Sequence, residues 1–214
     1  LLLDLCHKVA HHAQTVRDGK WCACPDFCYW ETPQMELAGK TLGIIGFGRI
    51  GRAVGRIAKA FGMEVLAYNR SRCPEGDAIA EYVDLDTLLA SSDVIALHCP
   101  LFPETEGIIN KETIAKMKDG VILVNVARGA VTDETAVANA VLSGKIGGFA
   151  TDVYSVEPFG QDHPMYALRE HPCVCMTPHM AWGAVEARQR CINEMAENIR
   201  AFSRGEVRCR VDLL

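Results

Sequence analysis

The sequence predicts an α/β fold, a doubly wound parallel sheet with long flanking helices. Two observations support this class. Short apolar runs alternate with helical patterns along most of the 214 residues, as in sheets built from strand–helix–strand units. The first apolar run leads into Gly46, Gly48 and Gly51, and a helical pattern follows these glycines. A chain of this length can bury one large core.

The elements follow one another in a regular order. Residues 1–17 have apolar positions at helical spacing and are expected to form one helix, whereas 20–36 have no clear period and are expected to form an aromatic arm. Seven apolar runs are expected to be strands: 41–45, 63–68, 81–83, 93–97, 120–125, 146–151 and 173–176. The helices expected between and after them span 50–61, 84–90, 111–117, 133–142 and 184–204. The residues that share one face of the first of these helices are Ile50, Val54, Ile57, Ala58 and Phe61.

Each glycine after the first strand has a physical role in binding a dinucleotide. Gly46 permits a tight turn, Gly48 lets the backbone approach a pyrophosphate, and Gly51 lets the helix pack closely on the strand. The free N–H groups of the helix N-terminus would bind the phosphates. In its strand–turn–helix–strand context the spacing therefore predicts dinucleotide binding. The alternative is a structural turn without a ligand.

The composition argues against several classes of partner. The net charge is −5 and the basic residues form no stripe, so we expect no nucleic-acid partner. No apolar run approaches the roughly 20 residues of a membrane span and no signal peptide is visible, so we expect no membrane partner. The ten cysteines include no complete C-x-x-C pair with matching histidines. We therefore assign no metal and expect reduced thiols in a cytoplasmic protein.

Four reactive side chains come shortly after predicted strands. They are Arg128 after the fifth strand, Asp152 and Glu157 after the sixth, and His179 after the seventh. Ligands of parallel α/β sheets gather at the carboxyl ends of the strands, so we expect a cation, two carboxylates and an imidazole at one edge. The alternative is that each is an ordinary surface loop residue.

Several of these motifs resemble those of the D-2-hydroxyacid dehydrogenases, and the match covers essentially the whole chain. The segments that carry it are Gly-Phe-Gly-Arg-Ile-Gly at 46–51, His-Cys-Pro-Leu at 98–101 with Pro-Glu-Thr at 103–105, Asn-Val-Ala-Arg-Gly at 125–129 with Asp-Glu at 133–134, Asp-Val at 152–153 with Val-Glu-Pro at 156–158, and Thr-Pro-His at 177–179. Segments 25–27, 179–182 and 186–188 are similar to the glycerate dehydrogenase (hydroxypyruvate reductase) branch. The resemblance implies a Rossmann-type fold.

The resemblance also implies a role for each residue at the strand exits. Arg128 would hold the substrate carboxylate and carbonyl oxygen, and His179 would protonate that oxygen as hydride arrives from the nicotinamide. Glu157 would hydrogen-bond the imidazole and favour its charged form. Asp152 would contact the nicotinamide carboxamide, and residues 98–100 would border the adenine. The implied cofactor contacts are Gly46, Phe47, Gly48, Arg49, Ile50, Gly51, Asn69, Arg70, Ser71, His98, Cys99, Pro100, Thr105, Val126, Ala127, Arg128, Asp152 and His179.

The end of the second strand departs from the family pattern. The family usually has Asp there to bind the ribose hydroxyls, whereas this chain has Asn69 followed by Arg70 and Arg72. A carboxylate would repel a 2′-phosphate, but an amide and two guanidiniums could accept one. We therefore expect NADP in preference to NAD, or use of both.

Family members are longer by roughly a hundred residues at the N-terminus, which is the size of a domain. We expect residues 1–18 to be an interdomain-type helix and 19–183 to be the dinucleotide-binding domain with its arm. Residues 184–214 are expected to be a helix and tail that bridge to a substrate domain. Such a chain would bind nucleotide but lack a complete substrate pocket, so its own turnover is in doubt.

The expected activity is NAD(P)-dependent reduction of a small 2-keto acid, hydroxypyruvate or glyoxylate, to the D-2-hydroxy acid. The resemblance also implies a homodimer that uses the first helix and the aromatic arm at 21–30. Three alternatives stay open: a corepressor-like protein that senses nucleotides, a formate dehydrogenase, and a fragment that binds cofactor without turnover. Formate dehydrogenases have Gln where this chain has Glu157, which disfavours the second alternative.

Overall fold

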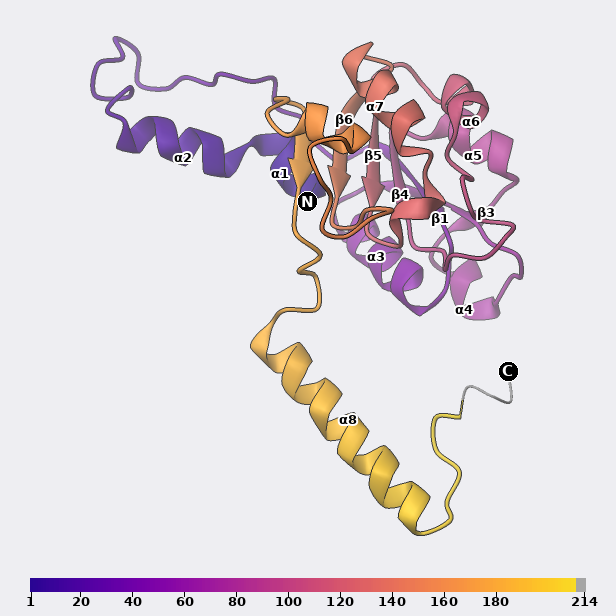
Figure 1. Cartoon of the computed structure of the whole chain (residues 1–214). Coiled ribbons are helices and arrows are strands. Elements are labelled where there is room, and N and C mark those ends of the chain that lie inside the picture. The colour runs from indigo at the N-terminus through magenta and orange to yellow at the C-terminus, as the bar shows by residue number, and fades with distance from the viewer. Residues whose placement is uncertain (211–214) are drawn as a thin grey trace. The chain divides into compact units, whose positions relative to one another are not determined.

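The computed structural model describes residues 1–210 and confirms the predicted doubly wound parallel sheet (Figure 1). The strand order is β3-β2-β1-β4-β5-β6-β7. The strands are β1 Thr41–Ile45, β2 Glu64–Tyr68, β3 Glu81–Tyr82, β4 Val94–Leu97, β5 Val121–Asn125, β6 Ile146–Thr151 and β7 Val174–Met176. The helices are α1 Leu2–His7, α2 Val9–Arg17, α3 Arg49–Ala60, α4 Pro74–Asp77, α5 Leu85–Ser91, α6 Lys111–Lys116, α7 Glu134–Leu142 and α8 Val185–Ser203, with 3₁₀ turns η1 Gly129–Val131 and η2 Pro164–Leu168.

The chain divides into two compact units, Leu1–Pro178 and His179–Leu214. The first unit contains the sheet and helices α1 to α7, and the second contains α8. The last four residues of the predicted C-terminal segment, 211–214, lie outside the described residues. In the part of the chain that the structure describes, every helix is too short or too polar to span a membrane.

The strands end level with one another at the carboxyl edge of the sheet. Ile45 at the end of β1 pairs with Tyr68 of β2 and with Leu97 of β4. The same row continues across the other half of the sheet through Asn125, Thr151 and Met176. Strand order reverses direction at β1, so the exits of β1 and β4 form the topological switch point where such sheets bind ligands.

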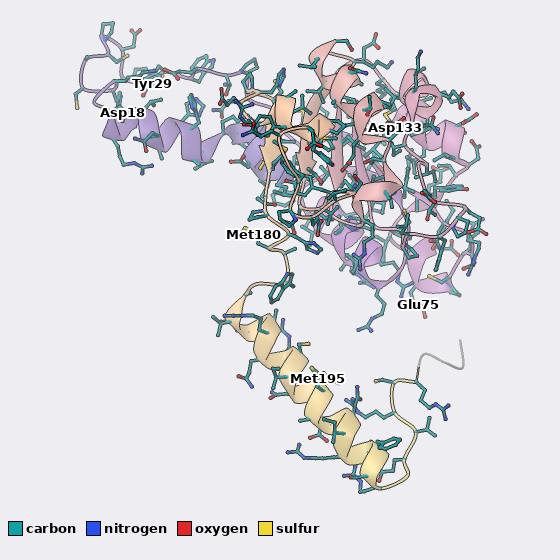
Figure 2. All side chains as sticks on the ribbon, viewed as in Figure 1. Asp18, Tyr29, Glu75, Asp133, Met180 and Met195 are labelled. Carbon is teal, nitrogen blue, oxygen red and sulfur yellow. The ribbon has the colours of Figure 1, made fainter. Side chains whose placement is uncertain are left out.

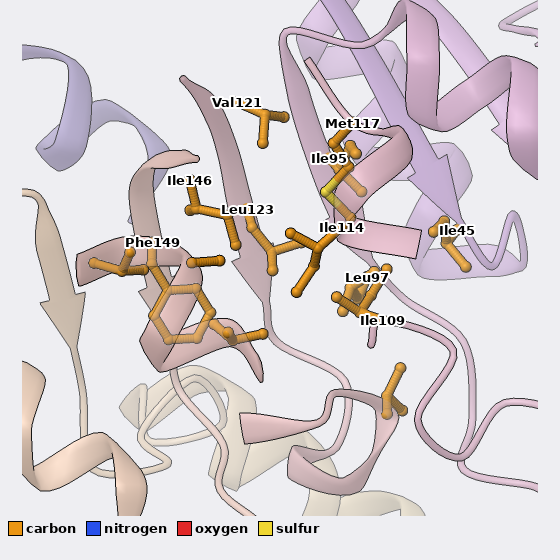
Figure 3. Packing of buried hydrophobic residues seen from close by; sticks show 14 of the residues in the cluster. Ile45, Ile95, Leu97, Ile109, Ile114, Met117, Val121, Leu123, Ile146 and Phe149 are labelled. Atoms are coloured by element: carbon orange, nitrogen blue, oxygen red, sulfur yellow. The ribbon is translucent and has the colours of Figure 1, made fainter. Parts of the chain in front are cut away.

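The sheet is buried on both faces, which is why its central strands are apolar throughout. One face packs against α5, α6 and α7, and the other packs against α1 and α3. The cluster on the first face includes Ile45, Leu97, Ile114, Leu123 and Phe149 (Figure 3). The cluster on the second face includes Leu5, Ile44, Ala58, Ala96 and Val124. Packing from both sides fixes the position of every strand exit.

The N-terminal region differs from the prediction in one respect. The single helix expected over 1–17 is wrong, because the chain breaks into α1 and α2 at Lys8, whose φ is 48°. No glycine or proline marks this break, and the hydrophobic period continues through it. The sequence pattern therefore predicts one continuous helix. The arm at 20–36 has no helix or strand, as expected, and it returns along α2, where the Tyr29 hydroxyl hydrogen-bonds Thr15 (Figure 2).

Helix α3 buries only part of the face that hydrophobic spacing indicates: Ala58 is buried and Val54 is half-buried, whereas the other members are exposed. Its buried residues are Gly51, Gly55 and Ala58. The large residues of the expected face are exposed: Ile50 (67%), Ile57 (58%) and Phe61 (45%). A Cβ on Gly51 would lie 2.3 Å from the carbonyl oxygen of Gly46, so the helix sits too close to the end of β1 for a larger residue there.

Candidate cofactor and substrate site

The loop between β1 and α3 is held against its neighbours by two glycines. Gly46 has a φ of 93°, and a Cβ there would lie 2.3 Å from the backbone nitrogen of Cys99. Its N–H donates to the carbonyl of Tyr68 at 2.9 Å. Gly51 packs back onto this turn. The tight turn predicted at Gly46 and the close packing predicted at Gly51 are therefore both present.

Gly48 has the opposite surroundings. It is the N-cap of α3, and no atom lies within 4 Å of the position its Cβ would take. No side chain caps this helix, so its first N–H groups are available to an anion. Arg49 and Ile50 are exposed in the first turn. Open space beside a helix N-terminus fits the phosphates of a dinucleotide, as the motif predicts.

Asn69 connects the end of β2 to the glycine loop. Its Oδ1 accepts the N–H of Phe47 at 3.0 Å, and its Nδ2 donates to the carbonyl of Ser71 at 2.7 Å. The Phe47 ring is buried, edge-on to Tyr82 with the centroids 5.6 Å apart. Phe47 can therefore meet a cofactor through its backbone only, whereas Asn69 already has a structural task.

The arginines near this end differ in their surroundings. Arg72 pairs with Asp77 at 3.2 Å and lies over the Tyr82 ring at 5.1 Å. Arg52 donates to the Sγ of Cys73 at 3.0 Å. Arg70 is exposed beside Asn69, so its guanidinium can meet a ligand at the end of β2.

The exit of β4 presents a neutral surface. Burial lowers the pKa of His98 to about 4, so its ring is neutral at physiological pH. Cys99 is buried, and burial raises the pKa of its thiol. Thr105 donates to the carbonyl of Pro100 at 2.6 Å and accepts the N–H of Phe102 at 2.8 Å, which closes the loop. Uncharged surroundings of this kind suit an adenine ring.

The exit of β5 is stiffened by the buried side chain of Asn125. Its Nδ2 donates to the carbonyl of Arg128 at 2.9 Å, and its Oδ1 accepts the N–H of Ala127 at 3.1 Å. The Arg128 guanidinium is exposed and donates to the carbonyl of Ala127 at 2.7 Å. The turn that carries Val126, Ala127 and Arg128 is thus fixed by Asn125, for which the sequence pattern predicted no separate role.

The exit of β6 carries the two carboxylates. Asp152 is 3% exposed, and its Oδ1 accepts the hydroxyl of Thr177 at 2.5 Å. Glu157 is exposed, and its Oε1 accepts the N–H of Tyr154 at 2.8 Å. The Tyr154 hydroxyl donates to the carbonyl of Thr177 at 3.0 Å, and burial raises its pKa to about 12. Asp152 and the Glu157 loop are therefore both tied to the exit of β7.

The turn after β5 and the loop after β6 lie in direct contact. A Cβ on Gly129 would lie 1.9 Å from the carbonyl carbon of Tyr154 and 2.1 Å from the nitrogen of Ser155. Arg128 precedes this glycine, and Glu157 follows Ser155 by two residues. The structure thus brings the predicted cation and the predicted carboxylate loop together.

His179 begins the second unit and is described with it. Its φ is 50°, an uncommon conformation for a residue with a side chain. Its carbonyl accepts the Nε1–H of Trp182 at 2.9 Å, which forms a turn before α8. The roles assigned to these site residues from the resemblance stay predictions.

The fold and the glycine loop define a dinucleotide-binding α/β domain with a polar strand edge. A family model described as "D-isomer specific 2-hydroxyacid dehydrogenase, NAD binding domain" matches residues 1–181. The chain belongs to this family, as its motifs indicate.

Relatives of known name agree with this assignment. The chain is 50% identical to a hydroxypyruvate reductase from Blautia hydrogenotrophica and 40% identical to a glycerate dehydrogenase from Methylorubrum extorquens, covering 96% of this chain and 63% of each relative. The crystal structure of a glyoxylate reductase from Paecilomyes thermophila has a TM-score of 0.85 at 36% identity, covering 98% of this chain and 62% of that one. A D-lactate dehydrogenase from Aquifex aeolicus, complexed with NAD and lactic acid, has a TM-score of 0.83 at 33% identity, covering 96% and 64%. The chain spans less than two thirds of the length of these relatives.

Proposed function

We propose that this chain is the cofactor-binding part of an NAD(P)-dependent oxidoreductase that reduces hydroxypyruvate or glyoxylate to the D-2-hydroxy acid. The names of the relatives support the substrate class. The observation that carries the proposal is the contact of Gly129 with the Tyr154–Ser155 peptide, because it holds Arg128 and the Glu157 loop at one edge of the sheet.

In this proposal each polar residue at the edge has one task. The Arg128 guanidinium binds the substrate carboxylate with two parallel hydrogen bonds and orients the adjacent carbonyl. A bound nicotinamide supplies the hydride. His179 donates a proton to the carbonyl oxygen, and Glu157 stabilises the protonated imidazole. Asp152, which accepts the Thr177 hydroxyl, also accepts the N–H of the nicotinamide amide.

The activity is tested on the longest natural polypeptide that contains this chain, called below the full protein. Oxidation of NADH and NADPH is followed with hydroxypyruvate and with glyoxylate. Arg128→Gln is expected to lower kcat/KM at least about a hundredfold, because substrate orientation is lost, while cofactor affinity stays within about threefold. Arg169→Gln, which removes the exposed arginine that directly follows η2, is the matched control. Cofactor binding without turnover of any 2-keto acid would contradict the proposal and favour a binding protein.

We infer a preference for NADP over NAD from the end of β2. Asn69 brings no negative charge there, and Arg70 is exposed next to it. Arg72 is occupied by Asp77 and Tyr82, so Arg70 is the primary candidate for the 2′-phosphate. Arg70→Ala is expected to weaken NADPH binding about tenfold and to leave NADH unchanged. Arg56→Ala, which makes the same charge change at an exposed position on α3, should alter the affinity for neither nucleotide. Tighter binding of NADH than of NADPH by the unaltered protein would contradict the preference.

We further propose a homodimer that uses the first helical region, α1 and α2, and the aromatic arm at 21–30. Phe27 is 89% and Trp30 is 67% exposed in the arm, and Val9 is 66% exposed on α2. Large contiguous apolar surface is usually covered by a partner. Phe27→Glu is expected to convert a dimer to a monomer in light scattering. Leu142→Glu, at an exposed position on α7, should not, and a monomeric unaltered protein would contradict the proposal.

The remaining proposals concern location and domains. All ten cysteines are free thiols, which supports a reducing, cytoplasmic compartment. Residues 1–18, which contain α1 and α2, and segment 184–214 are proposed to bridge the dinucleotide-binding region, 19–183, to a substrate domain in the full protein. Helix α8 supports this role because Ile192, Met195 and Ile199 are exposed on it. Limited proteolysis of the full protein should therefore cut near 184 before it cuts within the sheet.

A further inference from the structure

Glu134, the first residue of α7, carries a buried carboxylate at the centre of a polar cluster. Its relative exposure is 8%, and a buried charge is stable only when it is paired and hydrogen-bonded. Its Oε1 accepts the N–H of Ser155 at 2.9 Å. Its Oε2 accepts the hydroxyl of Ser155 and lies 3.0 Å from the Nε2 of His163. Three donors thus converge on one carboxylate.

The hydrogen bonds of His163 define which ring nitrogen carries the proton. Its Nδ1 accepts the N–H of Met165 at 3.3 Å, so the hydrogen lies on Nε2 and is donated to Glu134. The ring is 8% exposed, stacks on Phe159 at 5.0 Å and meets Tyr154 edge-on at 6.5 Å. His163 therefore joins the carboxylate to the aromatic centre of the loop after β6.

The cluster reaches the reactive residues through the backbone. Ser155 donates both its N–H and its hydroxyl to Glu134, and it shares a peptide bond with Tyr154. That peptide packs on Gly129, and the Tyr154 N–H donates to the Glu157 carboxylate. A shift of this peptide would move the Glu157 carboxylate. The same shift would remove the contact with Gly129 that holds the turn of Arg128.

We propose that Glu134 is a positioning residue for the 2-keto acid reduction, acting with Ser155 and His163. The inference rests on the proposed function and adds a residue to it that touches neither substrate nor cofactor. Glu134 sets the position of the Tyr154–Ser155 peptide, and through it the positions of Glu157 and Arg128. The task requires an acceptor for three donors, which a carboxylate provides and an amide does not.

The test compares Glu134→Gln with Glu112→Gln in the full protein. Glu112 is the matched control, because it also lies in the first turn of a helix, α6, but is exposed. Glu134→Gln is expected to keep its cofactor affinity within about twofold, to lower kcat about tenfold or more with a smaller change in KM, and to narrow the pH profile of kcat/KM. Glu112→Gln should match the unaltered protein. A folded Glu134→Gln variant with kcat within about twofold of the unaltered protein would overturn the proposal.

His163 supplies a second comparison that holds even where Glu134→Gln fails to fold. His163→Gln keeps an N–H donor for the carboxylate, whereas His163→Leu keeps volume without a donor. The proposal expects kcat to be largely retained in the first variant and lost in the second. Equal losses would show that His163 only fills space, and would overturn its positioning role.

Hydrogen exchange separates this proposal from the activity itself. If the unaltered protein reduces no 2-keto acid, the proposed function fails. The positioning of the peptide is then decided by the Tyr154 and Ser155 amides, which are expected to exchange at least about tenfold faster in Glu134→Gln than in Glu112→Gln. Unchanged exchange would overturn the proposal, because the loop would be held without Glu134.

Discussion

At the β1 exit Gly48 stands beside open space, whereas at the β5 exit a Cβ on Gly129 would lie 1.9 Å from the Tyr154 carbonyl carbon. The same residue type thus serves opposite purposes in two parts of one strand edge. The first region leaves room for a ligand to approach the backbone. The second brings two loops of the chain into contact with no room left. A glycine that leaves room for a ligand and a glycine that packs against another loop are distinguished by the atoms that a Cβ at each position would contact.

The largest effect is expected from Gly129→Ala. The added methyl group would overlap the Tyr154–Ser155 backbone, and backbone cannot move aside as a flexible side chain can. We expect the free energy of unfolding to fall by about 3 kcal/mol or more, measured by urea denaturation. A loss below about 1 kcal/mol would show that the two loops are not in firm contact.

A smaller, pH-dependent effect is expected at the β4 exit between these regions. The pKa of His98 is about 4 in the folded chain against an ordinary value of 6.5, because burial disfavours the charged ring. The unfolded chain therefore binds the proton first, and the contribution of neutral His98 is complete above pH 6.5 and is lost as pH falls to about 4.

The measurement is urea denaturation of the unaltered protein and of His98→Gln at several pH values. The unaltered protein should lose up to about 3 kcal/mol more than the variant between neutral pH and pH 4. Parallel pH dependence in the two proteins would show that the His98 ring is solvated, and that the β4 exit is not the neutral surface described above.

The smallest effect on stability is expected from Gly48→Ala. Its Cβ would meet no atom of the chain, and the cost is that of replacing Gly by Ala at an N-cap. We expect the free energy of unfolding to change by about 1 kcal/mol or less, measured as for Gly129→Ala. A loss as large as that of Gly129→Ala would remove the distinction between the two regions.

The two regions also differ in how far the sequence predicts them. The turn at Gly46, the packing of Gly51 and the seven strands follow from local patterns, since glycine spacing and apolar runs act over a few residues. Arg128 and Glu157 were predicted as site residues because strand exits meet at one edge, and their roles stay predictions. The break at Lys8 and the small-residue face of α3 were missed, because hydrophobic period records neither a left-handed residue nor a close approach.

The polar cluster of Glu134, Ser155 and His163 beside the loop after β6 was not predictable in the same way. In the sequence, Glu134 is an ordinary acidic residue in the first turn of a helix, where its negative charge would interact favourably with the helix dipole. Its partners Ser155 and His163 lie 21 and more residues further along the chain and belong to no recognisable spacing. Long-range pairs of this kind become visible only when packing brings the segments together.

The most direct test of the account is a fluorescence titration of the full protein and of Gly48→Ala with NADPH and NADH. Open space at Gly48 predicts that the unaltered protein binds both nucleotides, and the exposed Arg70 beside Asn69 predicts tighter binding of NADPH. The added methyl group should weaken binding of both at least about tenfold without a matching loss of stability. Absence of binding by the unaltered protein, or equal affinity in the variant, would contradict the assignment of this loop to the cofactor phosphates.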